Sequence, residues 1–137
     1  EAPDGQHVAK TPIEVFECVY ERVINKVKEL GAIPLVLSLP PMDAQRYFEF
    51  FSTGWTQELK ENVLRWLGGS TNTIMLGHEL YNLATWRVAQ RTGVQWVDVT
   101  SGLLKGNHFR DYLCEDGIHP NEMGQKKMAE AILRALE

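Results

Sequence analysis

Near its C-terminal end the chain reads CEDGIHPNEMG over residues 114–124. Asp116 stands three residues before His119, and Gly117 between them permits a sharp turn that would bring the two side chains together. In a serine hydrolase a histidine removes the proton of the nucleophile, and a carboxylate holds the imidazole in the required tautomer. The stretch therefore has two interpretations: the base half of a catalytic triad, or a polar loop that leads into a helix.

Metal binding is another chemistry that the same stretch suggests. Cys114, Asp116 and His119 are all metal-ligating residue types, and His108 is the nearest further candidate. A four-ligand site usually shows paired spacings with more His or Cys nearby, and this stretch lacks them. We therefore predict no metal ion here, and we expect Cys114 to pack under the loop.

A triad also needs a nucleophile, and none of the serines has the expected context. Ser70 follows two glycines in LGGSTN, but the segment follows a helical pattern, so we interpret the glycines as a helix stop and Ser70 as a turn residue or cap. Ser38 falls within an expected strand, and Ser52 and Ser101 have no activating neighbours. We therefore expect the nucleophile to lie outside these 137 residues.

The element with the most agreeing signals is a helix that begins at TPIEVF. Thr11 is a potential cap, Pro12 suits the first helical position, and Glu14 would complete a capping box. Gly31 is the expected stop. The apolar residues between them follow a 3.6-residue period: Val15, Phe16, Val19, Tyr20, Val23, Ile24, Val27 and Leu30. Cys18 lies on this pattern and is expected to be a buried thiol.

Two short apolar runs, residues 33–39 and 94–99, have the character of strands buried on both faces. Between and after them the sequence predicts helices over residues 42–51, 56–67 and 76–91 and from Pro120 to the end. Residues 1–10 and most of 100–118 are predicted as loop, with a helical turn near HFRDYL. Strands separated by helices favour an α/β fold with a parallel sheet.

Two strands of this kind do not make a stable sheet by themselves, because their outer edges carry unpaired backbone groups. The first helix also has no strand before it. We therefore expect further strands on the N-terminal side. They would belong either to a longer protein, of which this chain is one part, or to another chain.

The segment DGIHPNEMGQKKMAEAIL resembles the last block of the SGNH hydrolases, the GDSL-type esterase and acylhydrolase family. GVQWVDVTSGL resembles the strand before that block, and VINKVKELGAIPLVLSLPP resembles an earlier helix, strand and turn of the family. The resemblance implies a flavodoxin-like three-layer α/β/α fold. It implies that His119 is the general base and that Asp116 orients it.

The resemblance also implies the reaction. Members hydrolyse esters, often acyl or acetyl groups on sugars, lipids or small alcohols, through an acyl-enzyme and without a metal or organic cofactor. The family's Gly-Asp-Ser motif and the Gly and Asn of its oxyanion hole have no counterpart in this sequence. Residues 1–137 are therefore interpreted as the C-terminal part of one such domain, completed by an N-terminal segment or another chain.

Composition excludes several other classes of protein. The net charge is −4 and the pI is near 5.6, so a nucleic-acid-binding surface is not expected. No apolar run approaches the length of a membrane helix, and no signal peptide is visible. Two distant cysteines make no disulfide framework and fit a reducing cytoplasm.

Two rival functions remain open. In the first, the chain is a non-catalytic or degenerate flavodoxin-like binding module, in which Asp116 and His119 only tie the loop to the last helix. In the second it is a regulatory or nucleotide-binding domain, although no Gly-rich phosphate loop is present. In the esterase interpretation, residues 42–75 follow the C-terminal end of a strand, where open α/β sheets bind ligands, so this insertion is expected to shape specificity.

Overall fold

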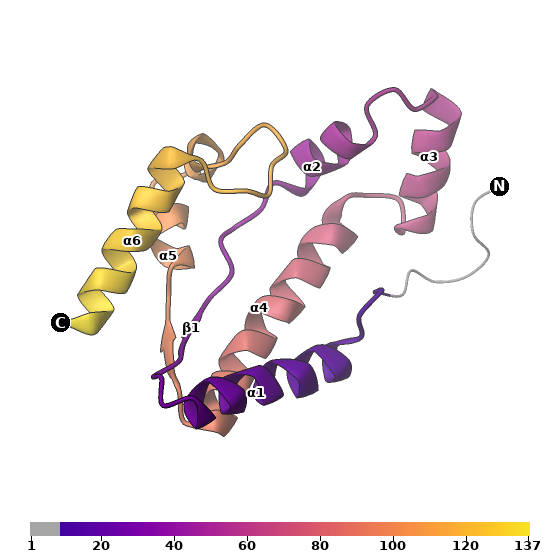
Figure 1. Ribbon diagram of the computed structural model, residues 1–137. Coiled ribbons are helices and arrows are strands. Elements are labelled where there is room, and N and C mark those ends of the chain that lie inside the picture. The colour runs from indigo at the N-terminus through magenta and orange to yellow at the C-terminus, as the bar shows by residue number, and fades with distance from the viewer. Residues whose placement is uncertain (1–8) are drawn as a thin grey trace.

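The computed structural model describes residues 9–137 of the chain. The loop expected over residues 1–10 lies mostly outside these residues, and so does His7. Figure 1 shows the arrangement of the helices and strands. In chain order these are α1 (Ile13–Glu29), β1 (Leu35–Leu37), α2 (Ala44–Phe51), α3 (Gln57–Trp66), α4 (Asn72–Thr92), β2 (Gln95–Val97), α5 (Thr100–Leu104), the 3₁₀ helix η1 (Phe109–Tyr112) and α6 (Glu122–Leu136).

The two strands pair in parallel, and Val36 lies opposite Trp96 at the centre of the pairing. Ser38 extends the ladder by donating its N–H to the carbonyl of Val97 at 3.0 Å. Both predicted strands are confirmed, although each is shorter than its apolar run. The fold is therefore α/β with a short two-stranded parallel sheet.

Helices lie on both sides of the strands. Helix α4 packs against β1 and β2, and α1 packs against α4. Helix α6 contacts β2 and, with α5, lies on the other side of the strands in Figure 1. The core between the strands and the first pair of helices is a single cluster of buried apolar side chains: Ile24, Val36, Val88, Ala89 and Val94.

Ion pairs join α1 to α4 beside this core. Glu17 accepts hydrogen bonds from both Arg87 and Arg91, and the Arg91 Nη1 to Glu17 Oε2 distance is 2.6 Å. The hydrogen bond from Arg91 is the main cause that lowers the pKa of Glu17, and burial opposes it. Because the Glu17 side chain is mostly buried, these bonds fix the two helices side by side.

The start of α1 differs from the prediction. The N-cap residue is Pro12 and no side chain caps the helix, so the expected capping box of Thr11 and Glu14 is wrong. The Thr11 carbonyl instead accepts a hydrogen bond from the hydroxyl of Tyr81 on α4. This hydrogen bond joins the start of α1 to α4, and the first N–H groups of α1 have no side-chain cap. The predicted stop at Gly31 is confirmed, since this residue has a left-handed φ of 78°.

Two further expectations are corrected by the structure. Cys18 and Cys114 are both exposed, whereas a buried position was predicted for each. Within the predicted loop 100–118, residues Thr100–Leu104 form α5. The Asp98 carboxylate accepts the N–H groups of Thr100 and Ser101 at 3.0 and 2.9 Å, which satisfies donors at the start of this short helix.

Several apolar side chains of the periodic helices are exposed. On α1 the stripe of Val15, Val19 and Val23 is about half exposed, although its period predicted a core face. Helices α4 and α6 also expose apolar residues: Leu76, Leu80, Leu83, Leu133 and Leu136. A two-stranded sheet offers too little surface to cover these faces. Among residues 9–137, no helix combines the length and apolar character needed to cross a membrane.

Candidate active site

The loop that carries Asp116 and His119 is closed by its own backbone. Leu113 and Pro120 form an antiparallel bridge, and the N–H of Cys114 donates to the carbonyl of His119 at 2.8 Å. Gly117 donates its N–H to the carbonyl of Cys114 at 3.1 Å and adopts a left-handed φ of 76°. This is the sharp turn that the sequence predicted at Gly117, and it folds Asp116 back toward His119.

Asp116 is bonded through both carboxylate oxygens. Oδ2 lies 2.5 Å from Nδ1 of His119, and Oδ1 accepts the N–H groups of Ile118 and His119 at 3.0 and 3.1 Å. The hydrogen bond with His119 is the main cause that lowers the pKa of Asp116 from 3.8 to about 2, helped by the two backbone donors and opposed by burial. The carboxylate is therefore ionised at neutral pH.

This ionisation fixes the role of each ring nitrogen in His119. An ionised carboxylate can only accept, so Nδ1 must carry the hydrogen that it shares with Asp116. In the neutral ring Nε2 is then unprotonated and has a free lone pair. The side chain of His119 is 72% exposed, so a reactant can reach it. The pair has the tautomer and accessibility that a general base requires.

The titration of Asp116 tests this geometry. We expect its carboxyl carbon to titrate in an NMR experiment with a midpoint near pH 2, and His119→Ala to move that midpoint toward the ordinary 3.8. Because the folded-state pKa is lowered, ionised Asp116 stabilises the fold above pH 3.8, and this contribution is lost as the pH falls through about 2. The control is His108→Ala, which should leave the midpoint unchanged; a midpoint near 3.8 in the unsubstituted protein would contradict the hydrogen bond.

Helix α6 anchors the C-terminal side of the loop. Asn121 is its N-cap, and its Oδ1 accepts the N–H of Gly124 at 3.0 Å. Its Nδ2 donates to the carbonyls of Asp111 and Leu113 at 2.7 and 3.2 Å. A Cβ on Gly124 would lie 2.4 Å from the carbonyl oxygen of Tyr112, so glycine is what allows η1 and α6 to approach this closely. The loop is therefore held between two elements.

Helix α2 anchors the other side of the loop. Asp43 donates its N–H to the carbonyl of Gly117 at 2.8 Å, and Arg46 donates to the carbonyls of Arg110 and Cys114 at 3.2 and 3.3 Å. The carboxylate of Asp43 is buried, caps α2 through the N–H of Arg46, and lies 2.7 Å from Nε of Arg110. The first turn of α2 thus fixes the position of Asp116 and His119.

Sequence reasoning did not identify Asp43, Arg46 or Arg110. The only signal was local: Asp43 lies at the start of the helix expected over residues 42–51, where an aspartate is typical of an N-cap. The two contacts of Arg46 with the loop reach across 64 and 68 positions of the chain, so no spacing rule would reveal them. They also place the beginning of the insertion, residues 42–75, directly against the Gly117 turn.

All four serines lie in the described part of the chain, and no hydrogen bond joins any of them to His119. Ser38 is buried and accepts the N–H groups of Val99 and Thr100, while Ser101 is bonded to Asp98. Ser70 accepts the N–H of Asn72 at 3.3 Å, as a turn residue does. Within residues 9–137, no three His, Cys, Asp or Glu side chains gather as a metal site would require, and the exposed Cys114 makes no such group with Asp116 and His119.

Comparison with known proteins gives one partial likeness. No protein-family profile matches the chain. A stretch of 50 residues is 44% identical to a protein of Xylanibacter ruminicola described as an acetylxylan esterase. This stretch is 36% of the present chain and covers 10% of that protein. The likeness connects part of the chain to an esterase-type protein.

Proposed function

We propose that this chain supplies the acid and base of the catalytic triad of an SGNH-type serine esterase. The observation that carries the proposal is the 2.5 Å contact between Asp116 Oδ2 and His119 Nδ1, on a side chain that is 72% exposed. It leaves Nε2 free to take a proton from a serine hydroxyl and to return it to the leaving alcohol. The partial likeness to an acetylxylan esterase favours ester hydrolysis over other acyl transfers.

The nucleophile and the oxyanion donors, in this proposal, come from polypeptide outside residues 1–137. The exposed edges of the two-stranded sheet and the exposed valine stripe of α1 support it, because an added parallel strand would cover both. With such strands the fold becomes the three-layer α/β/α arrangement of the family. An acetyl or other acyl ester of a sugar, lipid or small alcohol would then be the substrate.

Covalent labelling tests the proposal. A fluorophosphonate reacts with an activated serine hydroxyl, forming a P–O bond and releasing fluoride. We expect the complete protein to be labelled at a serine outside residues 1–137, and the 137-residue chain alone to show neither labelling nor turnover of an aryl acetate. The reason is that the chain holds the base but not the nucleophile. Labelling at Ser38, Ser52, Ser70 or Ser101 would show that the nucleophile has been misassigned.

A non-catalytic binding module is the second candidate, and one observation favours it. Asp116 Oδ1 accepts the N–H groups of Ile118 and His119, so this residue also closes the turn, a role that needs no reaction. In that case the pair would only tie the loop to α6. The same labelling separates the two candidates, because a module without an activated serine would react with the fluorophosphonate at no site.

A further inference from the structure

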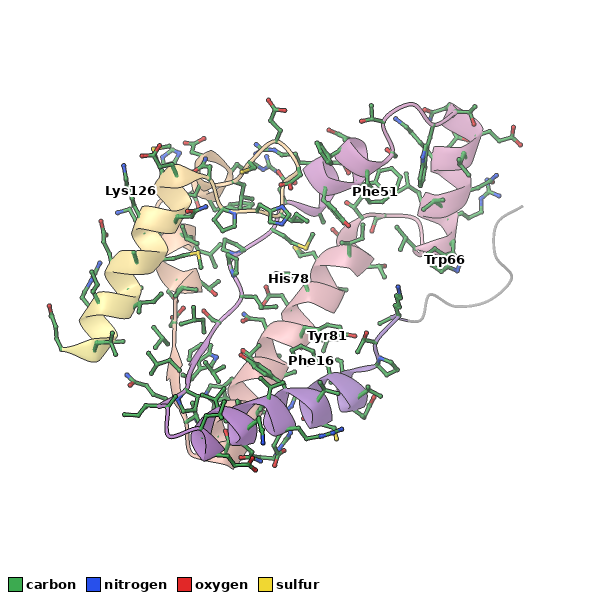
Figure 2. The ribbon with its side chains drawn as sticks, viewed as in Figure 1. Phe16, Phe51, Trp66, His78, Tyr81 and Lys126 are labelled. Atoms are coloured by element: carbon green, nitrogen blue, oxygen red, sulfur yellow. The ribbon has the colours of Figure 1, made fainter. Side chains whose placement is uncertain are left out.

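Helix α2 binds both ends of the turn that holds the acid of the proposed triad. The turn runs from Cys114 to Gly117, and the N–H of Gly117 closes it by donating to the Cys114 carbonyl at 3.1 Å. At one end Nη1 of Arg46 donates to that same carbonyl at 3.3 Å. At the other end the N–H of Asp43 donates to the Gly117 carbonyl at 2.8 Å. In Figure 2, α2 begins beside this loop and runs away from it to Phe51.

Arg46 also joins the turn to the 3₁₀ helix η1. The nitrogen that binds Cys114 donates a second hydrogen bond, to the carbonyl of Arg110 in η1, at 3.2 Å. One guanidinium nitrogen therefore connects the start of α2, the 3₁₀ helix and the turn. The Arg46 side chain is partly buried, which limits the positions that its guanidinium can take.

Charge balance does not account for these contacts of Arg46. The buried carboxylate of Asp43 has its close ion pair with Nε of Arg110, at 2.7 Å. Nε of Arg46 lies 3.9 Å from the same carboxylate, which is beyond hydrogen-bond distance. Arg110 is therefore the main partner of the Asp43 charge, and Arg46 directs its Nη1 to the two carbonyls instead.

The carbonyls that Arg46 binds do not depend on it for a donor. The Cys114 carbonyl also accepts the N–H of Gly117, and the Arg110 carbonyl also accepts the N–H of Leu113 at 3.3 Å. Loss of Arg46 would therefore leave neither carbonyl unpaired, and the cost of an unsatisfied buried group would not arise. What would be lost is the connection that fixes the turn relative to α2.

We propose that Arg46 is a positioning residue for the base of the proposed esterase, and that it acts on His119 through the Cys114 carbonyl. This proposal rests on the proposed function. Cys114 donates its N–H to the carbonyl of His119 at 2.8 Å, so a displacement of Cys114 is passed directly to His119. A base must lie within about 2.6–3.2 Å of the group whose proton it takes, and a misplacement of about 1 Å can cost roughly 10²-fold in rate.

Arg46→Met in the complete protein tests the proposal. We expect kcat for an aryl acetate to fall roughly 10- to 100-fold, because the base is displaced. The value of KM should stay within about threefold, because no contact with the substrate is removed. The thermal unfolding midpoint should fall by no more than roughly 5 °C, since both carbonyls keep a donor. Initial rates and thermal unfolding measure these effects.

The matched control is Arg65→Met. Arg65 is on the neighbouring helix α3, and among the described residues no hydrogen bond or ion pair joins its side chain to the loop. This control should leave kcat within about twofold of the unsubstituted protein. A fall in kcat no larger in Arg46→Met than in the control would overturn the proposal. A large loss of thermal stability in Arg46→Met would also overturn it, because the role of Arg46 would then be structural.

Arg46→Lys separates the hydrogen bonds from the charge. Lysine keeps a positive charge near Asp43, but its ammonium ends one bond short of the position of Nη1 and lacks the planar fork of a guanidinium. We therefore expect this variant to recover the thermal midpoint and only part of kcat. Full recovery of kcat would show that the charge, and not the pair of carbonyl contacts, is what the reaction needs.

The titration of Asp116 gives a measure of position that needs no turnover. Arg46 makes no direct contact with the Asp116 carboxylate, so a shift of its midpoint in Arg46→Met would report a displaced turn with longer hydrogen bonds. We expect the NMR midpoint to rise from about 2 toward 3.8. If it rises while the fluorophosphonate labels no serine, Arg46 positions the pair and the esterase proposal fails. If a serine is labelled while midpoint and kcat stay unchanged, the role of Arg46 is wrong and the esterase proposal stands.

Discussion

His119→Ala in the complete esterase proposed here should lower kcat for a simple aryl ester by roughly 10⁴- to 10⁶-fold, as removal of the histidine does in known triads. The reason is that Nε2 of His119 is the unprotonated ring nitrogen on an accessible side chain, and no other group in the loop can take the proton of a serine. Initial rates of aryl acetate hydrolysis measure the effect. Added imidazole should restore part of the lost activity, because it supplies the missing base without changing the fold.

The control for this substitution is His108→Ala. His108 precedes the same loop but forms no hydrogen bond or ion pair with Asp116 in the described chain, so activity should stay within about twofold of the unsubstituted protein. His119→Ala removes the hydrogen bond that stabilises ionised Asp116, but the side chain is 72% exposed, so the thermal unfolding midpoint should fall only slightly. Full activity in His119→Ala would refute the catalytic assignment, and a large loss of stability would favour a structural role for the pair.

The candidate site was predictable from sequence only in its local part. The spacing of Asp116, Gly117 and His119 was enough to predict a turn that joins acid and base, because all the required groups are within four residues. The support of that turn was not predictable. Asp43 and Arg46 bind backbone carbonyls of the loop more than 60 residues away. Every residue has a backbone carbonyl, so the sequence does not indicate which of them accept these bonds.

In the fold, too, local features were predictable from the sequence and contacts between distant residues were not. Helical periodicity predicted α1, α4 and α6, and the two apolar runs predicted β1 and β2. Both kinds of pattern depend only on residues that are close together in the sequence. The capping box at Thr11 failed because the N-cap residue is Pro12, whose side chain has no hydrogen-bond acceptor. The burial expected for Val15, Val19 and Val23 failed for a different reason: periodicity says that a face is apolar but does not say whether the partner surface is present.

The exposed faces and the catalytic proposal depend on the same feature. The sheet of residues 9–137 has two strands, and each strand leaves one edge unpaired. Parallel strands are stable when both faces and both edges are covered, and the additional strands of the proposed function would cover both the unpaired edge and the valine stripe of α1. A serine that follows such a strand would lie at the carboxyl edge of the sheet, the edge from which the chain leaves β1 toward α2 and the Gly117 turn.

Gly117→Ala should lower the free energy of unfolding by about 2–5 kcal/mol, the sum of a left-handed backbone without glycine and an overpacked contact. The residue has a φ of 76°, and an added Cβ would lie 2.8 Å from the carbonyl oxygen of Asp43 and 2.9 Å from the nitrogen of Tyr47. Both atoms are backbone atoms of the α2 start, so neither can rotate away. The loop must therefore move off α2, and Asp116 and His119 move with it.

Gly54→Ala separates the two causes. Gly54 has a similar φ of 81°, but a Cβ there would meet nothing within 4 Å, so this substitution should cost only the backbone strain of about 1–2 kcal/mol. Urea unfolding measures both variants, and the excess loss in Gly117→Ala is the cost of separating the loop from α2. Catalysis should fall only in Gly117→Ala, since the Gly54 turn does not hold the loop. Equal losses of stability in the two variants, with unchanged turnover, would show that contact with α2 does not position the Asp116–His119 pair.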